Sequence, residues 1–185
     1  MMSTHRSLLR ALVLVALSAM SGCGLASVSP IIGDADVDYD PALIGTWEDS
    51  AGKDSAVITA SGPGAYHITY TDGDGKVGKF GGRLGRLGRY RVLDVRPDDP
   101  APEASSLYTT LLMRAHAPVF VETGSRRALR FWMLKPDTVK HYLEQQPNAL
   151  AHAMIDDGVL ITASAPETRA FLLLMAERKG AFGDT

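Results

Sequence analysis

The stretch YHITYTDGDGKVGKFGGRL (residues 66–84) decides the fold. In residues 66–70, aromatic or aliphatic side chains alternate with His67 and Thr69, which is the period-2 pattern of a half-buried strand. Asp72-Gly73-Asp74-Gly75 then precedes a second β-rich run over residues 77–84. Because glycine adopts positive φ at no steric cost, Asp-Gly between two such runs predicts a β-hairpin.

The same turn also resembles the start of a calcium-binding EF-hand loop. Counting twelve residues from Asp72 reaches Arg83, where a bidentate glutamate would be needed. The histidines show no His-x₃-His spacing, and Cys23 is the only cysteine, so no metal-site pattern is present. We therefore interpret residues 72–75 as a hairpin turn and expect neither a metal nor a cofactor.

Outward from this hairpin, β-rich runs recur about every 10 to 13 residues. They cover residues 43–48, 56–60, 66–70, 77–84, 90–95, 107–115, 118–123 and 128–134. Such regular short strands predict an antiparallel β-barrel or sandwich. The period then changes: a short helix is expected over residues 136–146, a brief strand over 159–162, and a terminal helix after the capping box Ser164-x-x-Glu167.

The N-terminus carries a different signal. Arg6 and Arg10 precede an apolar run over residues 11–20, which is too short to span a bilayer. A positive segment, a short apolar segment and then small residues are typical of a secretory signal peptide. Met20-Ser21-Gly22-Cys23 resembles the lipobox of bacterial lipoproteins. This resemblance implies cleavage before Cys23 and lipid attachment to Cys23; the alternative is an ordinary signal peptide with an incidental cysteine.

Three segments follow from this interpretation: a lipoprotein signal peptide (residues 1–22), a flexible acidic tether (23–40) and a β-barrel domain with two C-terminal helices (41–182). Aspartates alternate along the tether, at positions 34, 36, 38 and 40. They could collect a hard cation, but self-repulsion in a solvated linker is the preferred explanation. Gly24, rather than Asp, follows the cysteine, which by analogy with enterobacterial sorting favours the outer membrane.

Composition excludes some functions. Lys and Arg number 19 against 21 acidic residues, for a net charge of −2. Removal of residues 1–22 takes away Arg6 and Arg10 and no acid, so the mature chain has 17 basic residues and a charge of −4. This balance is unlike the basic footprint of a nucleic-acid-binding domain. With one cysteine there is no internal disulfide, even though the cell envelope would permit one.

A basic stretch runs through the middle of the chain. It contains Lys76, Lys79, Arg83, Arg86, Arg89 and Arg91, with no acid before Asp94. Arginine forks bind phosphate well, so the stretch could meet lipid phosphates or anionic glycans. The alternative is a bent pair of edge strands kept soluble by charge, with glycines supplying curvature.

The folded region as a whole resembles a family. Gly45-Thr46-Trp47 resembles the first strand of lipocalin and other calycin barrels. Together with Arg86-Leu87-Gly88-x-Tyr90-x-x-Leu93-Asp94 and Leu160-x-Thr162-Ala163, it resembles uncharacterised bacterial lipoproteins with a lipocalin-like barrel and C-terminal helices. The resemblance implies a fold for residues 42–182 and no activity, because fold alone does not define function.

Candidate catalytic groups are few. Asp94, His116 and Glu122 could converge if their strands pair, giving a base held by a carboxylate. The simpler explanation is that His116 is a turn residue whose hydrogen bonds are satisfied locally. Ser164 is explained by helix capping, and Asp156-Asp157-Gly158 by a turn. The aromatic residues line either a ligand cavity or a filled core: Trp47, Tyr66, Tyr70, Phe80, Phe131 and Trp132.

The sequence therefore predicts a lipid-anchored lipoprotein of the bacterial cell envelope, attached through Cys23 and non-enzymatic. Its barrel is expected to bind a small or amphipathic ligand or an envelope protein, and no nucleic acid. The alternatives are a structural or assembly subunit with a filled barrel, and a hydrolase or isomerase that uses His116 with a carboxylate.

Overall fold

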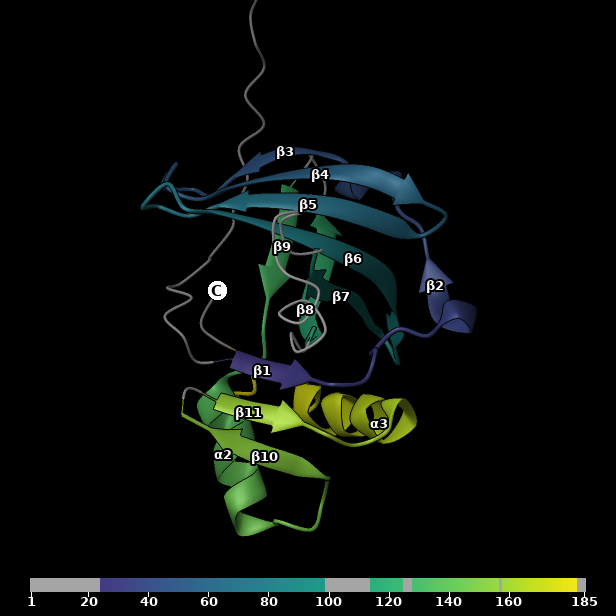
Figure 1. Cartoon of the computed structure of the whole chain (residues 1–185), viewed down its shortest axis with the longest axis vertical. Helices are drawn as coiled ribbons and strands as arrows, with labels where there is room; N and C mark the ends of the chain where they lie inside the picture. The colour runs from purple at the N-terminus through teal and green to yellow at the C-terminus, as the bar shows by residue number, and fades with distance from the viewer. Residues whose placement is uncertain (1–23, 99–113, 125–127, 157, 183–185) are drawn as a thin grey trace, which may run out of the picture.

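An antiparallel sheet dominates the computed structural model, which describes residues 24–98, 114–124, 128–156 and 158–182. Seven strands follow one another along the chain and along the sheet, and the short strand β2 (Val37–Asp38) pairs with β6 beside them. Figure 1 shows that this sheet is strongly curled. The seven are β3 (Gly45–Glu48), β4 (Ser55–Gly62), β5 (Ala65–Thr71), β6 (Val77–Leu87), β7 (Tyr90–Pro97), β8 (Ala117–Gly124) and β9 (Ala128–Trp132).

The predicted hairpin lies at the centre of this sheet. Strands β5 and β6 pair from Thr71 opposite Val77 to Ala65 opposite Arg83. Gly75 adopts a φ of 78°, the left-handed conformation that glycine reaches without strain. The Asp72 carboxylate accepts the amides of Asp74 and Lys76 at 3.0 and 2.8 Å. The Asp72 side chain therefore stabilises the turn, as expected.

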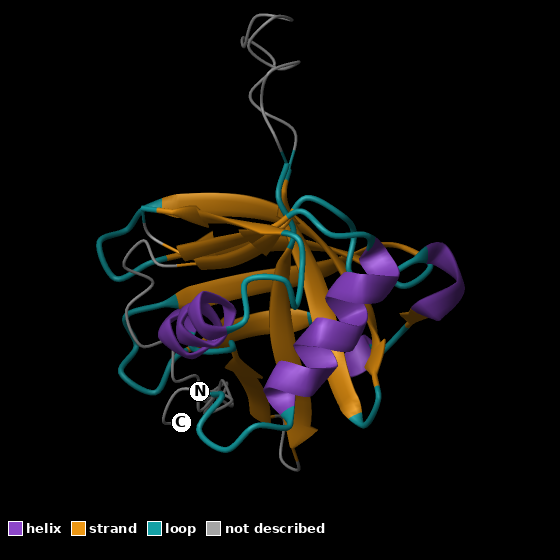
Figure 2. Cartoon of the chain, turned by 90° about the horizontal axis from the view of Figure 1, so that it is seen from below, coloured by secondary structure: helices purple, strands orange, loops and turns teal. Residues whose placement is uncertain are grey.

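A smaller sheet and two helices complete the molecule. Strand β1 (Gly24–Ser27) pairs in parallel with β11 (Gly158–Ile161), which pairs with β10 (His152–Ile155). Helices α2 (Pro136–Gln145) and α3 (Ala165–Ala176) lie beside this sheet, below the curled one (Figures 1 and 2). The expected mainly β fold, a lipocalin-like antiparallel meander followed by C-terminal helices, is therefore confirmed.

Two hydrophobic clusters hold these parts together. One fills the inside of the curled sheet and includes Trp47, Tyr66 and Leu93. The other joins the small sheet and both helices to the curled sheet, through residues such as Phe120 and Leu172. Of the aromatic residues considered for a cavity, Trp47 and Tyr66 are buried within the first cluster, Phe80 and Phe131 pack against it, and Trp132 packs against the second.

The N-terminal segment differs from the expected solvated tether. Leu25 is buried in β1, and Ile31 and Ile32 are completely buried in the second hydrophobic cluster. The physical reason is that the apolar side chains of residues 25–32 gain more from burial than the aspartates that follow lose by approaching the protein. We call residues 29–43 the N-terminal strap; it pairs with β6 through Val37 and Asp38 and ends with Leu43 in the first cluster.

One further expectation needs correction. The basic strands β6 and β7 are not edge strands, because each is paired on both sides. The helix expected over residues 136–146 is confirmed, ending at Gln145 with Gln146 as its cap. The strand expected at residues 107–115 lies for the most part outside the described residues, as does Cys23.

Candidate functional site

The strap's aspartates meet the arginines of the basic stretch. Four carboxylates form ion pairs with four guanidinium groups: Asp34 with Arg83, Asp36 with Arg169 at 2.9 Å, Asp38 with Arg86 at 3.7 Å, and Asp40 with Arg91 at 2.8 Å. Three of these arginines lie on β6 and β7, and the fourth lies on α3. The strap therefore neutralises three of the six basic residues of that stretch: Arg83, Arg86 and Arg91.

The pair Asp40–Arg91 is the most buried of the four. Burial raises the pKa of the Asp40 carboxyl, but the Ala42 amide and the Arg91 guanidinium stabilise its charged form more, so the pKa lies below its ordinary value. Arg91 also donates to the Thr123 hydroxyl at 3.2 Å. Arg169 donates to the backbone oxygens of Ile31 and Arg86, both at 3.2 Å. These bonds fasten the strap at both ends.

Glycine at position 85 lets the strap approach. A Cβ there would lie 2.7 Å from two carbon atoms of Ile32 and 2.8 Å from the backbone oxygen of Asp36. Gly64, at the β4–β5 turn, has a φ of 65°, and its Cβ would overlap the side chain of Val37. The glycines of this region therefore serve close packing of the strap, in addition to any role in curving the sheet.

A groove of about 710 Å³ lies between the strap and the β4–β5 turn. This volume is within the range of small-molecule sites. Asp34, Asp38 and Arg83 supply its charged groups, and the backbone of residues 62–64 forms one side. We call it the strap groove. Its lining combines a solvent-exposed ion pair with an exposed aromatic ring.

That ring belongs to Tyr39, which is 47% exposed. It stacks on Tyr66, with ring centres 5.9 Å apart and planes inclined by 11°. The hydroxyl of Tyr66 accepts from the Asp40 amide at 2.8 Å and donates to the Asp40 carbonyl at 3.2 Å. Burial raises the pKa of Tyr66, so its phenol stays neutral and keeps both bonds. Tyr39 is thus held on a rigid support.

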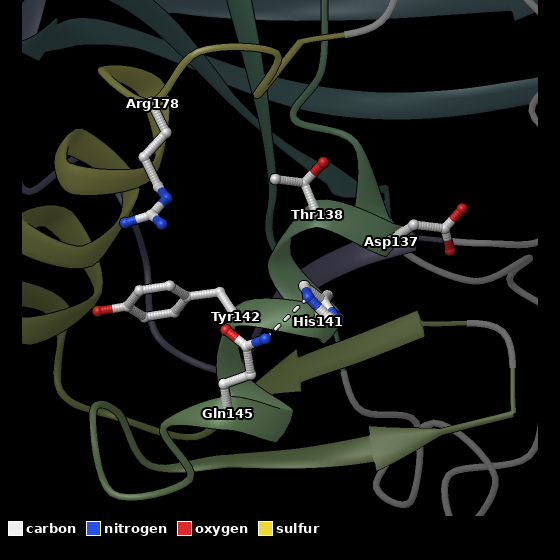
Figure 3. Close-up of a pocket in the computed structure, with 6 residues that line it drawn as sticks. All are labelled: Asp137, Thr138, His141, Tyr142, Gln145 and Arg178. Carbon is white, nitrogen blue, oxygen red and sulfur yellow. Dashed lines mark hydrogen bonds between the residues drawn. The ribbon is translucent and has the colours of Figure 1, made fainter.

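A second, smaller pocket of about 310 Å³ lies between α2 and the end of α3 (Figure 3). The Arg178 guanidinium lies 4.8 Å from the centre of the Tyr142 ring, a cation–π contact. The Gln145 side-chain nitrogen lies 2.9 Å from Nε2 of His141. The polar groups of this pocket are engaged with one another, as those of the strap groove are, but its volume is less than half as large, so the strap groove is the stronger candidate for a ligand site.

Of the predicted catalytic set, the structure brings two residues together. Nδ1 of His116 lies 2.9 Å from Oδ1 of Asp94, which is only 3% exposed. The other oxygen of Asp94 accepts the amides of Ile31 and Ile32 at 2.9 and 3.2 Å. Glu122 does not join them; it lies on an exposed face, 3.4 Å from Arg130.

Asp94 therefore acts as a clasp. It joins β7 to the strap through two amides and to His116 through the imidazole. The backbone of His116 in turn exchanges two 2.8 Å hydrogen bonds with Ser27 of β1. Neither the strap groove nor the smaller pocket is lined by Asp94 or His116, and the geometry of the pair is explained by packing.

The remaining sequence candidates have structural positions. The Ser164 amide donates to the Glu167 carboxylate at 3.0 Å, as a capping box requires. Asp156 lies in the connection between β10 and β11, as the turn interpretation expects. The sequence interpretation missed the groove because Tyr39 and the other residues on its strap side were assigned to a tether. The alternation in Asp-Ala-Asp-Val-Asp-Tyr-Asp (residues 34–40) was the available signal, since period 2 also indicates a strand.

Comparisons with known proteins do not extend this description. No protein-family model matches the chain, and no curated protein or solved structure is significantly similar to it. Within the described residues, no helix is both long and apolar enough to cross a membrane. No group of three or more His, Cys, Asp or Glu side chains in the described part of the chain is arranged to hold a metal ion.

Proposed function

We propose that this chain is a lipid-anchored lipoprotein of the bacterial cell envelope that binds a small amphipathic ligand in the strap groove. The anchor rests on the sequence around Cys23, where a positive segment, an apolar segment and small residues precede the only cysteine. Two or more acyl chains would hold the protein at a membrane stably, because a single chain is marginal.

The observation that carries the binding proposal is the supported ring of Tyr39 beside the charged side chains of Asp34 and Arg83. Small-molecule sites combine an apolar or aromatic surface with a few polar groups that fix orientation. Here Tyr39 offers an exposed ring, while Asp34 and Arg83 offer an acceptor and a donor that already hold each other. A site whose aromatic ring is already held in place binds a ligand more tightly, because less conformational entropy is lost on binding.

The lining indicates the ligand's chemistry. A ligand with a flat apolar face would cover Tyr39, and hydroxyl or amide groups at its edge would meet the carboxylates of Asp34 and Asp38. A strongly anionic ligand fits less well, because four arginines near the strap are neutralised by its own aspartates. A small saccharide has the favoured combination of surfaces.

The test measures binding of small saccharides to the purified protein and to Tyr39 variants by ligand-observed NMR. Tyr39→Ala is expected to weaken binding at least tenfold, whereas Tyr39→Phe keeps the ring and is expected to bind within about threefold of the original. Val57→Ala, at another exposed apolar residue, is the control. Equal binding by the Tyr39→Ala variant and the original protein would refute the groove as the site.

The anchor has a separate test. Cys23→Ser is expected to abolish incorporation of radiolabelled palmitate and to block maturation. Continued labelling of this variant would refute lipid attachment at Cys23.

A second function, as a structural or assembly subunit, is favoured by the filled interior. The concave side of the curled sheet holds a cluster of buried side chains that includes Trp47, Tyr66, Leu84 and Leu129. Cross-linking in intact cells distinguishes the two functions: a specific protein partner that Tyr39→Ala leaves bound supports assembly, and a co-purifying small molecule supports ligand binding.

A further inference from the structure

No linker separates the lipid-attachment position from the folded domain, because strand β1 begins at the next residue. Gly24, the residue after Cys23, already pairs with Gly158, and the ladder continues to Ser27 opposite Ile161. A Cβ on Gly158 would lie 2.0 Å from the backbone oxygen of Gly24, so the two strands are in close contact at this point. If Cys23 carries the anchor, the domain must lie directly against the membrane.

An apolar surface lies at the same end of the small sheet. Met154 and Ile155 on β10 are 41% and 45% exposed, although both are large apolar side chains. Ile155 pairs with Gly158, which pairs with Gly24 on the other side, so the three residues form one row across the sheet. Figure 1 shows the three strands β10, β11 and β1 side by side. We call Met154 and Ile155 the β10 patch.

The distance from this patch to the anchor follows from backbone dimensions. Neighbouring strands lie about 4.8 Å apart, so two spacings place the Cα atoms of Ile155 and Gly24 about 10 Å apart. One further residue adds about 3.8 Å at most. The β10 patch is therefore within about 14 Å of the Cys23 Cα, a reach that spans the polar headgroup region, about 5 to 8 Å thick on each side of a bilayer.

The shape of the patch favours lipid over a protein partner. Successive side chains of a strand point to opposite faces, so Met154 and Ile155 make the end of β10 apolar on both sides. A flat protein interface would cover only one of these faces. An edge that enters the headgroup region is surrounded by lipid on both sides, which is the environment that the two residues require.

We propose that the β10 patch is a membrane-contact surface that lies in the headgroup region of the bilayer beside the acylated Cys23. This inference rests on the lipid anchor of the proposed function and adds the orientation of the domain. Exposed Asp156 adjoins the patch, so the surface suits bilayers rich in phosphatidylethanolamine, whose ammonium group complements a carboxylate, better than strongly anionic ones.

The experiment uses the mature acylated protein in vesicles of phosphatidylethanolamine and phosphatidylglycerol. Acylation consumes the thiol of Cys23, the only natural cysteine, so a cysteine introduced by Ile155→Cys can be labelled alone with an environment-sensitive fluorophore. Val77→Cys is the matched control, because Val77 is an apolar strand residue that is 61% exposed and lies on the curled sheet. Lipids that carry a spin label near the headgroup then quench any fluorophore in contact with the bilayer.

Quenching at position 155 is expected to exceed that at position 77 at least threefold, and Met154→Cys is expected to behave like Ile155→Cys. An acylated protein whose positions 154 and 155 are quenched no more than position 77 overturns the membrane contact and leaves the anchor standing. Fluorophore self-quenching at 155 that grows with protein density, without quenching by spin-labelled lipid, also overturns it, in favour of a second copy. Absence of acyl groups from the intact mass overturns both the anchor and the contact.

Discussion

Replacing Asp94 by alanine is expected to be among the most destabilising changes to a polar residue in the strap region. The substitution removes the acceptor for two amides and one imidazole nitrogen, at 2.9, 3.2 and 2.9 Å. Each buried donor left without a partner costs about 1 to 3 kcal/mol. Because water can reach some of the space vacated by the carboxylate, we expect a total loss of about 3 to 5 kcal/mol in the free energy of unfolding.

Asparagine at the same position sharpens the test. Its side-chain oxygen can still accept the amides of Ile31 and Ile32, and its side-chain nitrogen can donate to the imidazole of His116. Asp94→Asn should therefore cost about 1 to 2 kcal/mol, because it weakens three bonds and orphans none. The matched control is Asp98→Ala, which removes another Asp–His pair, 3.5 Å from His67, that is exposed to solvent and should cost less than about 1 kcal/mol.

The assay is urea-induced unfolding followed by tryptophan fluorescence, with Trp47 and Trp132 as the two reporters. The expected order of destabilisation is Asp94→Ala, then Asp94→Asn, then Asp98→Ala. If Asp94→Ala proves no more destabilising than Asp98→Ala, the clasp does not hold the strap, and a role for Asp94 outside packing must be sought.

Three further predictions concern the strap and β1. Leu25→Ala should lower the free energy of unfolding by about 2 to 4 kcal/mol in chemical denaturation, since Leu25 is buried; a flexible tether would show no change. Gly85→Ala should cost about 1 to 3 kcal/mol by overpacking against Ile32, whereas Gly81→Ala on the same strand, in ordinary contact with its neighbours, should cost less than half as much in the same assay. The pKa of Asp40 is lower in the folded protein than in the unfolded chain, so its carboxylate stabilises the fold fully above the unfolded pKa of about 4, and this stabilisation is lost as the pH falls through the folded pKa. Asp40→Asn should therefore flatten the fall of Tm with acid below pH 4. An unchanged slope would contradict this.

The central sheet was predictable because its signals are local. The alternation over residues 66–70 and the Asp-Gly turn define one hairpin without reference to the rest of the chain. The order of β3 to β7 then follows from short connections, and the capping box at Ser164 marks a helix start on its own. Each of these features depends on neighbours within about ten residues.

The strap and its groove depend on contacts that no local pattern reveals. The aspartates at positions 34–40 indicate a tether when considered alone, and the arginines at 83–91 indicate an anion site when considered alone. Their pairing joins residues about 50 positions apart, as Asp34 with Arg83 does. Ile31-Ile32 was the sequence feature that a solvated tether could not explain. The site was missed because the charges of residues 34–40 decided the interpretation, and the burial expected of Ile31 and Ile32 was not considered.

The parallel pairing of β1 with β11 has a consequence for the order of folding. The Ser29 hydroxyl donates to the carbonyl of Ala163, 134 positions away, and β1 depends on β11 for its ladder. Contacts of such long range form slowly, because the intervening chain must first be ordered. During synthesis from the N-terminus, β1 and the isoleucines that follow it must therefore wait until nearly the whole chain has been made. A nascent chain stalled before residue 158 would present these apolar residues to whatever chaperone accompanies it.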